Sequence, residues 1–235
     1  MKTSRGTIRR IIKGDLGYES YKVRVAPKVT DQHKAKRRSF GTWISKNITK
    51  SMTKKKLFAD EKYFRINGIV KKQNDRIYAA TRDEADDKGS IHHTMQFSSG
   101  VMVELRMCYE GVTRSVIIEE GAINSERYIN EILPVALEDR EKMLDSDFIF
   151  QQDNAPADRD KLTQHWCKEY FPHFWTKDRW LANSPDLNPL DYSIWGELHQ
   201  QIDWRRVTSR QTLIDEIKQG MKKIRTEIVR RSVCS

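Results

Sequence analysis

Three aspartates stand where short apolar or Pro-rich segments end, positions at which a carboxylate can be held rigidly and still meet a ligand. Asp60 follows KLFA, Asp153 follows FIFQQ, and Asp191 follows PDLNPL at the expected start of a helix. Carboxylates converging from separate elements suit Mg²⁺, a hard ion that prefers oxygen ligands. Two such ions about 3.5–4 Å apart can activate an attacking oxygen and stabilise a leaving oxygen in phosphoryl transfer.

Position alone does not single out these three residues, because the chain has 33 acidic residues and most such side chains are solvated or cap helices. Neither DEADDKG (83–89) nor DNAPADRD (153–160) has the spacing of an EF-hand with its turn glycine. A glycosidase with paired carboxylates has no supporting motif. Glu61 is set aside, because neighbouring residues of a strand point to opposite faces.

The elements that must position these residues follow from hydrophobic periodicity and turn signals. Strands are predicted at 57–66, 77–80, 101–107, 115–119 and 148–152. Helices are predicted at 123–139, 158–170, 191–202 and 210–230, with a weaker helical pattern at 30–44. Strands first, then strands alternating with helices, indicate an α/β fold with a mixed sheet flanked by helices.

The net charge of +10 is concentrated at one end of the chain. Residues 1–56 hold 17 Lys and Arg against 3 Asp and Glu (17 − 3 = +14), and residues 57–235 hold 26 against 30 (−4). This split indicates a polyanion-binding arm, whose affinity would come from phosphate neutralisation and counterion release. A solvated basic tail is the alternative.

A short helix is predicted at 4–14, with isoleucines at helical spacing on one face and basic residues on the other. A recognition helix needs one face to pack and one to meet a DNA groove, although an ordinary amphipathic helix has the same pattern. The predicted DNA-binding residues are Arg5, Arg9, Arg10 and Lys13.

Membrane insertion and secretion are not expected. No run approaches the roughly 20 apolar residues that span a bilayer, and the basic N-terminus is not followed by the apolar segment of a signal peptide. Cys108, Cys167 and Cys234 are far apart, which is typical of a reducing compartment such as the cytosol or nucleus.

Three blocks of sequence carry a family resemblance. FADEKYF (58–64), QQDNAP (151–156) and NSPDLNPLDYSIWGEL (183–198) resemble the signature blocks of mariner-type DNA transposases. The intervals agree, with 92 residues between Asp60 and Asp153 and 37 between Asp153 and Asp191, as in the three-aspartate subgroup. NDRIYA (74–79) and GAINSERYINEIL (121–133) are also similar.

The resemblance implies an RNase H-like catalytic fold in which Asp60, Asp153 and Asp191 hold two Mg²⁺ or Mn²⁺ ions. It implies cut-and-paste DNA transposition: strand cleavage by water, then attack of the freed 3′-hydroxyl on target DNA. The implied partner is double-stranded DNA, as transposon ends and target, with a possible homodimer and a nuclear location. No small-molecule substrate is expected. Asn154 would orient Asp153, or would only form the turn before Pro156.

Domain organisation is also taken from the resemblance. Residues 1–29 are expected to be a remnant of the second helix-turn-helix DNA-binding unit, since TIRRIIKGDLG (7–17) is similar to its end. Residues 30–56 are expected to be a basic linker, and 57–235 the RNase H-like catalytic domain. Because relatives begin with two helix-turn-helix units, a truncated copy is expected.

Several positions depart from the family pattern. Asp158 stands where a His is usual, Glu104 where a Trp is common, and Leu181 where a Pro is usual. Asp158 would disturb the metal site or merely cap the following helix, and a buried Glu104 would need a partner or neutralisation. Two readings stay open: a metal-dependent DNA strand-transfer enzyme, and a catalytically inactive transposase-derived DNA-binding protein.

The charge split yields the first prediction. Deleting residues 1–56 removes most of the salt-sensitive DNA affinity, because these residues carry the basic excess. The measurement is the slope of log K against log salt for duplex DNA, for the full chain and for residues 57–235. A steep slope retained by residues 57–235 would place the basic surface elsewhere.

Overall fold

The computed structural model describes residues 4–17, 30–66, 99–144, 146–153, 155–181 and 184–234. The predicted strand at 77–80 and the predicted residue Asn154 lie outside these ranges. The chain divides into two compact units, Met1–Lys34 and Ala35–Ser235. None of the described helices is long and apolar enough to cross a membrane.

The first unit contains the short helix expected near the N-terminus. Helix α1 (Arg5–Arg10) begins at Ser4, whose hydroxyl oxygen accepts a hydrogen bond from the Thr7 amide at 3.2 Å. It continues as the π-helical turn η1 (Ile11–Asp15). Its basic residues are exposed, but so are its isoleucines, including Ile8 at 47%. The apolar face therefore contributes no buried residue to this unit.

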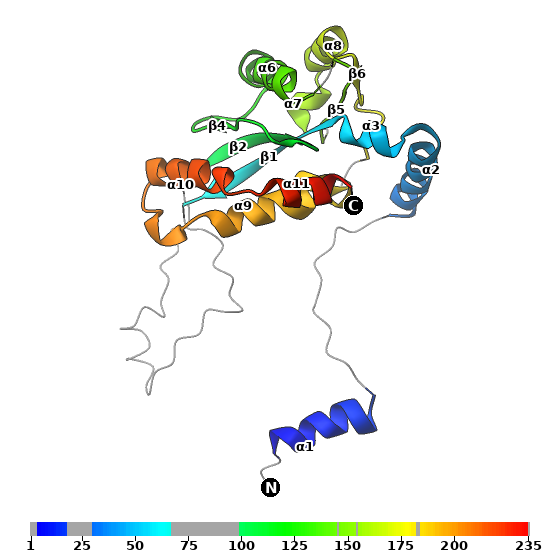
Figure 1. Ribbon diagram of the computed structural model, residues 1–235, viewed down its shortest axis with the longest axis vertical. Coiled ribbons are helices and arrows are strands. Elements are labelled where there is room, and N and C mark those ends of the chain that lie inside the picture. Colours follow the sequence, from blue (N-terminus) through cyan, green and yellow to red (C-terminus); the bar gives the residue numbers. More distant parts are fainter. Residues whose placement is uncertain are drawn as a thin grey trace. The chain divides into compact units, whose positions relative to one another are not determined.

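Strand β1 (Lys56–Arg65) lies in the middle of the sheet of the second unit (Figure 1). It pairs antiparallel with β2 (Gly100–Cys108) and parallel with β5 (Ile149–Gln151). Among the described strands the order is β3-β2-β1-β5-β6, with β4 also paired to β2. The remaining strands are β3 (Gly111–Val112), β4 (Val116–Ile118) and β6 (His173–Phe174).

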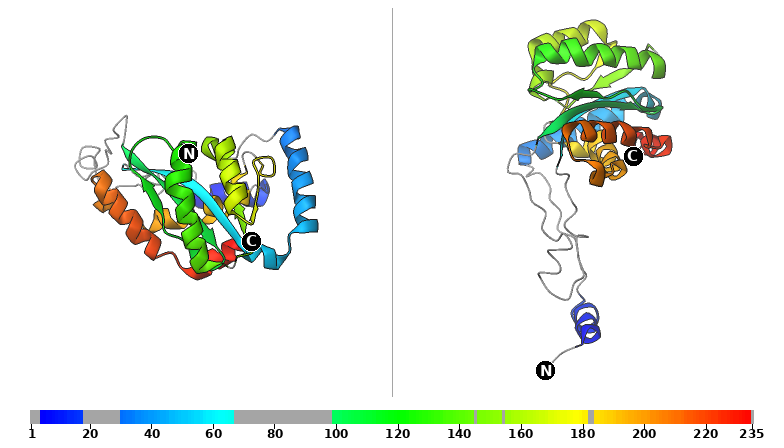
Figure 2. Two further views of the ribbon diagram at one scale, coloured as in Figure 1. Left: turned by 90° about the horizontal axis from the view of Figure 1, so that it is seen from above. Right: turned by 90° about the vertical axis from the view of Figure 1, so that its left-hand side faces the viewer.

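One face of the sheet is covered by the helices between β4 and β6, as the end-on view in Figure 2 shows. Tyr128, Ile132 and Leu133 from this layer are fully buried against Leu57 and Phe150 of the sheet. The elements are α5 (Ser125–Arg127), η3 (Tyr128–Ile132), α6 (Leu133–Met143), α7 (Pro156–Arg159) and α8 (Lys161–Tyr170).

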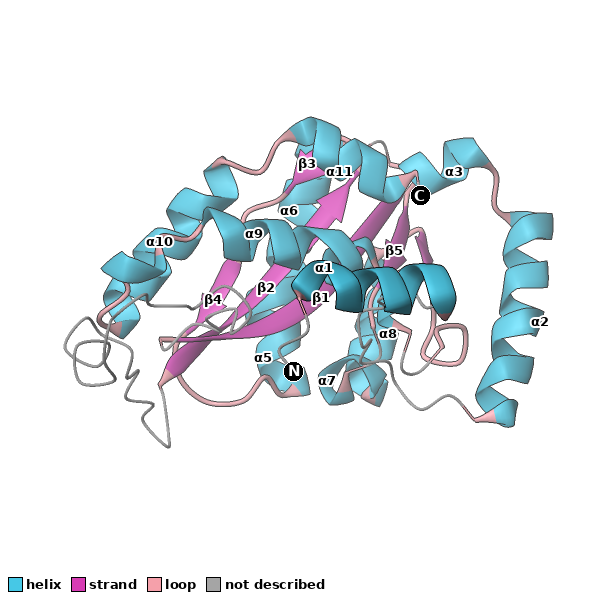
Figure 3. Cartoon of the chain, turned by 90° about the horizontal axis from the view of Figure 1, so that it is seen from below, coloured by secondary structure: helices cyan, strands magenta, loops and turns pink. Residues whose placement is uncertain are grey.

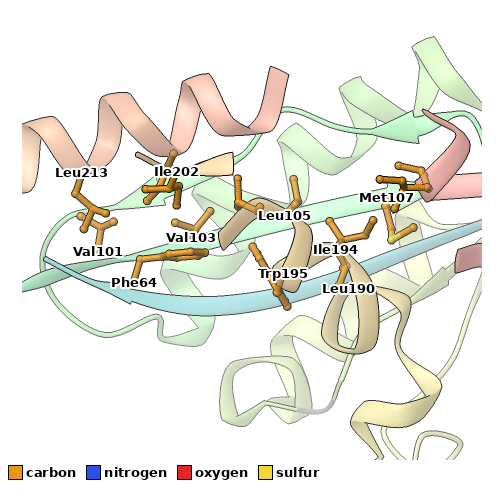
Figure 4. Packing of buried hydrophobic residues seen from close by; sticks show 14 of the residues in the cluster. Phe64, Val101, Val103, Leu105, Met107, Leu190, Ile194, Trp195, Ile202 and Leu213 are labelled. Carbon is orange, nitrogen blue, oxygen red and sulfur yellow. The ribbon is translucent and has the colours of Figure 1, made fainter. Parts of the chain in front are cut away.

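The C-terminal helices cover the opposite face (Figure 3). Alternate apolar residues of β2, among them Val103 and Leu105, pack there against Ile194 and Trp195 (Figure 4). This alternation follows from the two-residue period of a strand. The elements are η5 (Leu190–Ile194), α9 (Trp195–Gln201), η6 (Trp204–Arg206), α10 (Arg210–Lys222) and α11 (Thr226–Val233).

Helices α2 (Asp31–Asn47) and α3 (Lys50–Lys54) precede the sheet, and the helical pattern at 30–44 is confirmed. Phe40 of α2 is buried, and its ring lies edge-on to Trp175 and Trp180, with centroids 5.5 and 6.4 Å apart. Aromatic pairs in this geometry stabilise by about 0.5–1.5 kcal/mol beyond their buried area. The stretch expected to be a linker therefore contains a packed helix.

The predicted mixed sheet flanked by helices is confirmed, and one helix prediction is wrong. The stretch 210–230 forms two helices, because α10 ends at Lys222 and α11 begins at Thr226. At the break, the amides of Lys223 and Ile224 bond to carbonyls three residues back. The turn allows α11 to bury Val229 against the sheet. The two-residue strands β3 and β6 were not predicted, since so short a run carries no periodicity.

Strand β2 contains a buried charge pair among its apolar residues. Glu104 is 1% exposed and Arg106 is fully buried, and Oε2 of Glu104 lies 3.2 Å from a guanidinium nitrogen of Arg106. Arg106 also donates hydrogen bonds to the carbonyl oxygens of Ile132 and Arg114. Neither carboxylate oxygen of Glu104 has an aligned hydrogen-bond donor. Burial raises the pKa of Glu104 to about 7, although Arg106 opposes the shift.

This raised pKa predicts how stability depends on pH. Because the folded-state pKa lies above the ordinary value, the stabilisation is present below about pH 4.5 and is lost as pH rises through about 7. Glu104→Gln should therefore reduce the loss of unfolding free energy between pH 5 and 8, by on the order of 2 kcal/mol. Urea titrations at both pH values measure this. The exposed Glu119→Gln is the control, and equal pH dependence in both variants would contradict the assignment.

Candidate active site

The sheet topology brings Asp60, in the middle of β1, near Asp153, which follows the end of the neighbouring strand β5. The parallel pairing of β1 with β5 ends at Phe58 opposite Gln151. Two residues further along each strand direction stand Asp60 and Asp153. Parallel strands open a crevice beyond their carboxyl ends, where ligands bind in open α/β sheets.

Asp60 is held by a tryptophan that the sequence analysis did not select. The indole Nε1 of Trp195 donates a hydrogen bond of 2.6 Å to Oδ2 of Asp60, and the two residues are 1% and 7% exposed. Trp195 is itself packed against Phe64, with ring centroids 5.9 Å apart. It belongs to the block at 183–198, and this membership was the signal available in the sequence. The indole thus determines the direction of the Asp60 carboxyl group.

Asp191 approaches Asp60 and Asp153 from the layer of C-terminal helices. It lies in the first turn of η5, where its amide donates to the carbonyl of Asn188 at 3.0 Å. The side chain of Asn188, 2% exposed, accepts from the Leu190 amide at 3.2 Å. Asn188 therefore shapes the loop before Asp191.

The three carboxyl groups influence one another electrostatically. Burial and then the charges of Asp191 and Asp153 raise the pKa of Asp60 to about 7, against the opposing effect of the Trp195 hydrogen bond. Burial and then the charge of Asp153 also raise the pKa of Asp191, while Lys62 and a hydrogen bond with Asp60 lower it. Oδ1 of Asp153 accepts from the Ala155 amide at 2.9 Å. The predicted triad is therefore one interacting cluster.

The cluster is not closed into a ligand cage. Within the described ranges, no three His, Cys, Asp or Glu side chains stand in an arrangement ready to hold a metal ion. All the donors are carboxylate oxygens, and the charges of Asp191 and Asp153 both raise the pKa of Asp60. Mutual repulsion of this kind is what a bound cation would relieve, so the donor set fits a hard divalent ion.

A second group of acidic residues lies on the other side of β1. Glu61 is paired with Glu104 in the β1–β2 register. Its burial, together with Glu104, Asp153 and Asp60, raises its pKa to about 8. The sequence analysis set Glu61 aside because it would face away from Asp60. The register of β1 with β2, which the sequence does not reveal, places the carboxyl group of Glu104 opposite Glu61.

Asp158 has a capping role, within the helix α7 that contains it, and its effect on a metal site stays a prediction. Its Oδ2 accepts a hydrogen bond from the Ala155 amide at 3.2 Å, which caps α7. Its side chain is also 2% exposed and lies against Asp153. Burial raises its pKa well above the usual range, and the charges of Glu61 and Asp153 raise it further. The residue that replaces the family's histidine is thus a buried neighbour of the triad.

The remaining predicted residues lie elsewhere. Arg5, Arg9, Arg10 and Lys13 are exposed residues of the first unit. Asp186 precedes the triad residue Asp191 but turns outward and is 59% exposed, where it pairs with Arg37 of α2. Its role is therefore in the loop, in agreement with the sequence analysis.

Comparisons with known proteins agree with this geometry. No family model matches the chain. It is 29% identical over 199 residues to the transposable element Tc3 transposase of Caenorhabditis elegans, which covers 84% of this chain and 56% of the relative. It is 26% identical over 88 residues to the Tc1 transposase of the same organism, covering 37% and 31%. The chain thus spans from about a third to just over half of these relatives.

Solved structures show the same fold. The Mos1 mariner paired-end complex with Mn superposes with a TM-score of 0.77 at 19% identity, covering 98% of this chain and 67% of that chain. The catalytic domain of Mos1 mariner transposase superposes with a TM-score of 0.64 at 15% identity, covering 89% and 91%.

The mixed sheet and its two helical layers form an RNase H-like fold, the fold of the Mos1 catalytic domain. In sequence the chain is similar to the Tc1 and Tc3 transposases, as the sequence blocks indicated.

The coupled carboxyl groups give a prediction for Asp191→Asn. Removing this charge should lower the pKa of Asp60 below about 7, because Asp191 is the neighbouring carboxylate that raises it most. The free energy of unfolding should then fall less steeply as pH rises through about 7. Carbon-detected NMR titration of the Asp60 side chain measures the change, with the exposed Asp178→Asn as control. An unchanged pKa of Asp60 in Asp191→Asn would show that the charge of Asp191 does not act on Asp60.

Proposed function

We propose that this chain is the catalytic region of a cut-and-paste DNA transposase, in which Asp60, Asp153 and Asp191 support metal-dependent strand cleavage and strand transfer. The observation that supports the proposal is the electrostatic influence among these three carboxyl groups, which come from β1, from the residues after β5 and from η5. The Tc3 sequence match over 84% of the chain supports the transposase class.

Two Mg²⁺ or Mn²⁺ ions bound by the triad would neutralise charge on the phosphate and increase the acidity of the attacking hydroxyl or water. The protein's own residues supply the geometry. Trp195 orients Asp60, the Ala155 amide orients Asp153, and the Asn188 carbonyl holds the backbone of Asp191. This division of roles needs no catalytic histidine, because the ions replace a dedicated protein base. Two of the Mos1 complexes with similar folds contain Mn and Mg.

The proposed partner is double-stranded DNA, as transposon ends and as target. The Mos1 paired-end complex with left transposon end has the same fold and supports this assignment and a homodimer. Residues 1–29, with Arg5, Arg9, Arg10 and Lys13, are proposed as a DNA-binding segment, and 30–56 as a basic stretch, containing the packed helix α2, that leads into the catalytic domain 57–235. No small molecule or membrane is required, and action on chromosomal DNA supports a nuclear location.

A second candidate is a catalytically inactive, transposase-derived DNA-binding protein. It is favoured by the open arrangement of the triad and by the buried Asp158 beside Asp153, which adds a carboxyl group where relatives have a histidine. In this second candidate, the fold and the basic segment bind DNA, and the three aspartates catalyse no reaction.

Nicking and strand transfer on supercoiled plasmid and linear duplex DNA distinguish the two candidates. With Mg²⁺ or Mn²⁺ the unaltered chain should be active, and Asp153→Ala should lose activity by on the order of 100-fold or more. The exposed Asp178→Ala serves as the matched control and should retain activity. Equal activity with and without Asp153 would refute the role of the triad. Inactivity of all three proteins, with DNA affinity intact, would favour the binding protein.

A further inference from the structure

Helix α2 makes a direct polar contact with the loop that leads to Asp191. Nη1 of Arg37 donates to Oγ of Ser184 at 2.9 Å and to Oδ1 of Asp186 at 3.1 Å, and Nη2 donates to Oδ2 of Asp186. The contact joins residues 149 positions apart in sequence. A guanidinium that binds both oxygens of a carboxylate fixes direction as well as distance.

The loop itself is a short, internally bonded connection from Ser184 to Asp191. The Leu187 amide donates to the carbonyl of Ser184 at 3.0 Å, which closes the 3-10 turn η4 (Pro185–Leu187). Asn188 then bonds to the amides of both Leu190 and Asp191. A displacement of Asp186 is therefore transmitted along a stiff segment to the third carboxyl group.

The other end of the contact is equally well anchored. Arg37 lies three residues before Phe40, so both side chains leave α2 on the same face. Phe40 is buried against Trp175 and Trp180, and the guanidinium of Arg179 lies over the Trp43 ring at 4.0 Å. The helix is thus held to the sheet domain independently of Arg37.

The charges of the two partners support one another. The hydrogen bond to Asp186 raises the pKa of Arg37, and the same bond to Arg37 lowers the pKa of Asp186. Both groups are therefore ionised at neutral pH. The side chains are 30% and 59% exposed, so the pair belongs to the class whose measured contribution is modest.

We propose that Arg37 is a positioning residue for the active site: by binding Asp186 and Ser184 it holds the loop 184–191 so that the carboxyl group of Asp191 stays beside Asp60 and Asp153. This inference rests on the proposed metal-binding role of the triad. It makes α2, which lies in the stretch expected from sequence to be a linker, part of the machinery that places the third ligand. A shift of α2 would then move the carboxyl group of Asp191, although α2 does not itself contact the three aspartates.

The test is a charge exchange across the pair, with Arg37→Glu, Asp186→Arg and the double variant. Tb³⁺ is the probe, a hard cation whose luminescence is sensitised by a nearby indole, here Trp195 beside Asp60. The signal lost in Asp153→Ala defines the ion bound at the triad. Each single variant should weaken Tb³⁺ binding by about fivefold, equivalent to about 1 kcal/mol, and the double variant should recover most of the affinity.

Arg38→Glu makes the same change of charge at the adjacent, exposed position of α2 and should leave Tb³⁺ binding unchanged. Unchanged affinity in Arg37→Glu, or no recovery in the double variant, would overturn the inference. If a variant with reversed charge does not fold, the neutral variants Arg37→Gln and Asp186→Asn replace it and should show the same weakening.

Hydrogen exchange gives a readout that needs no metal. The amides of Leu190 and Asp191 should exchange faster in the single variants than in the unaltered chain or Arg38→Glu, while the amides of β1 keep their protection. Absence of triad-specific Tb³⁺ binding in the unaltered chain would refute the metal-binding role, and the exchange data would still test the contact. Equal exchange at Leu190 and Asp191 in all variants would refute the positioning role.

Discussion

Negative charge kept close together and partly out of water is the constraint on which this structure depends. Asp60, Asp153 and Asp191 come from three separate elements, and the charges of Asp153 and Asp191 make ionisation of Asp60 less favourable. Such a cluster is stable only where rigid surroundings hold it. Trp195 supplies a buried donor for one oxygen of Asp60, the Ala155 amide donates to Asp153, and the backbone of Asp191 is held by its own amide, which donates to the Asn188 carbonyl. The stability of the fold is thus used to maintain a locally unfavourable arrangement.

The same constraint extends through the central strand to its other face. Asp60 and Glu61 point to opposite sides of β1, yet Asp153 influences both, because it lies just beyond the end of the neighbouring strand. Glu61 faces Glu104, whose charge is in turn opposed by the fully buried Arg106. The departures Glu104 and Asp158 therefore belong to one connected set of buried carboxyl groups. This connection explains why a substitution on one face can alter ionisation on the other.

Helix α2 shows how a stretch without obvious chemistry can contribute to the site. Its aromatic residues pack on Trp175 and Trp180, and Arg37 binds the loop before Asp191. The stretch from residue 30 to 56 therefore combines strong basicity with a defined place on the catalytic unit. Proteins that act on polyanions benefit from such an arrangement, because the surface that meets the ligand is mechanically continuous with the reacting groups.

The amino-acid sequence by itself determined the main elements and indicated the three aspartates. Strands such as β1 and β2 were predictable because their apolar residues follow a local period, and Asp60, Asp153 and Asp191 were recognisable because each stands in a distinctive block. The break between α10 and α11 and the short strands were not predictable, since packing against distant residues decides them.

Only the tertiary structure decided the environment of the chemical groups. The indole donor of Asp60 lies 135 residues away from it, Arg37 lies 149 residues from Asp186, and the Glu61–Glu104 pairing depends on the register of two strands. A residue's type and local pattern are properties of the chain. Its burial, hydrogen-bond donors and neighbouring charges, which set how it ionises, are created only when distant segments are brought together.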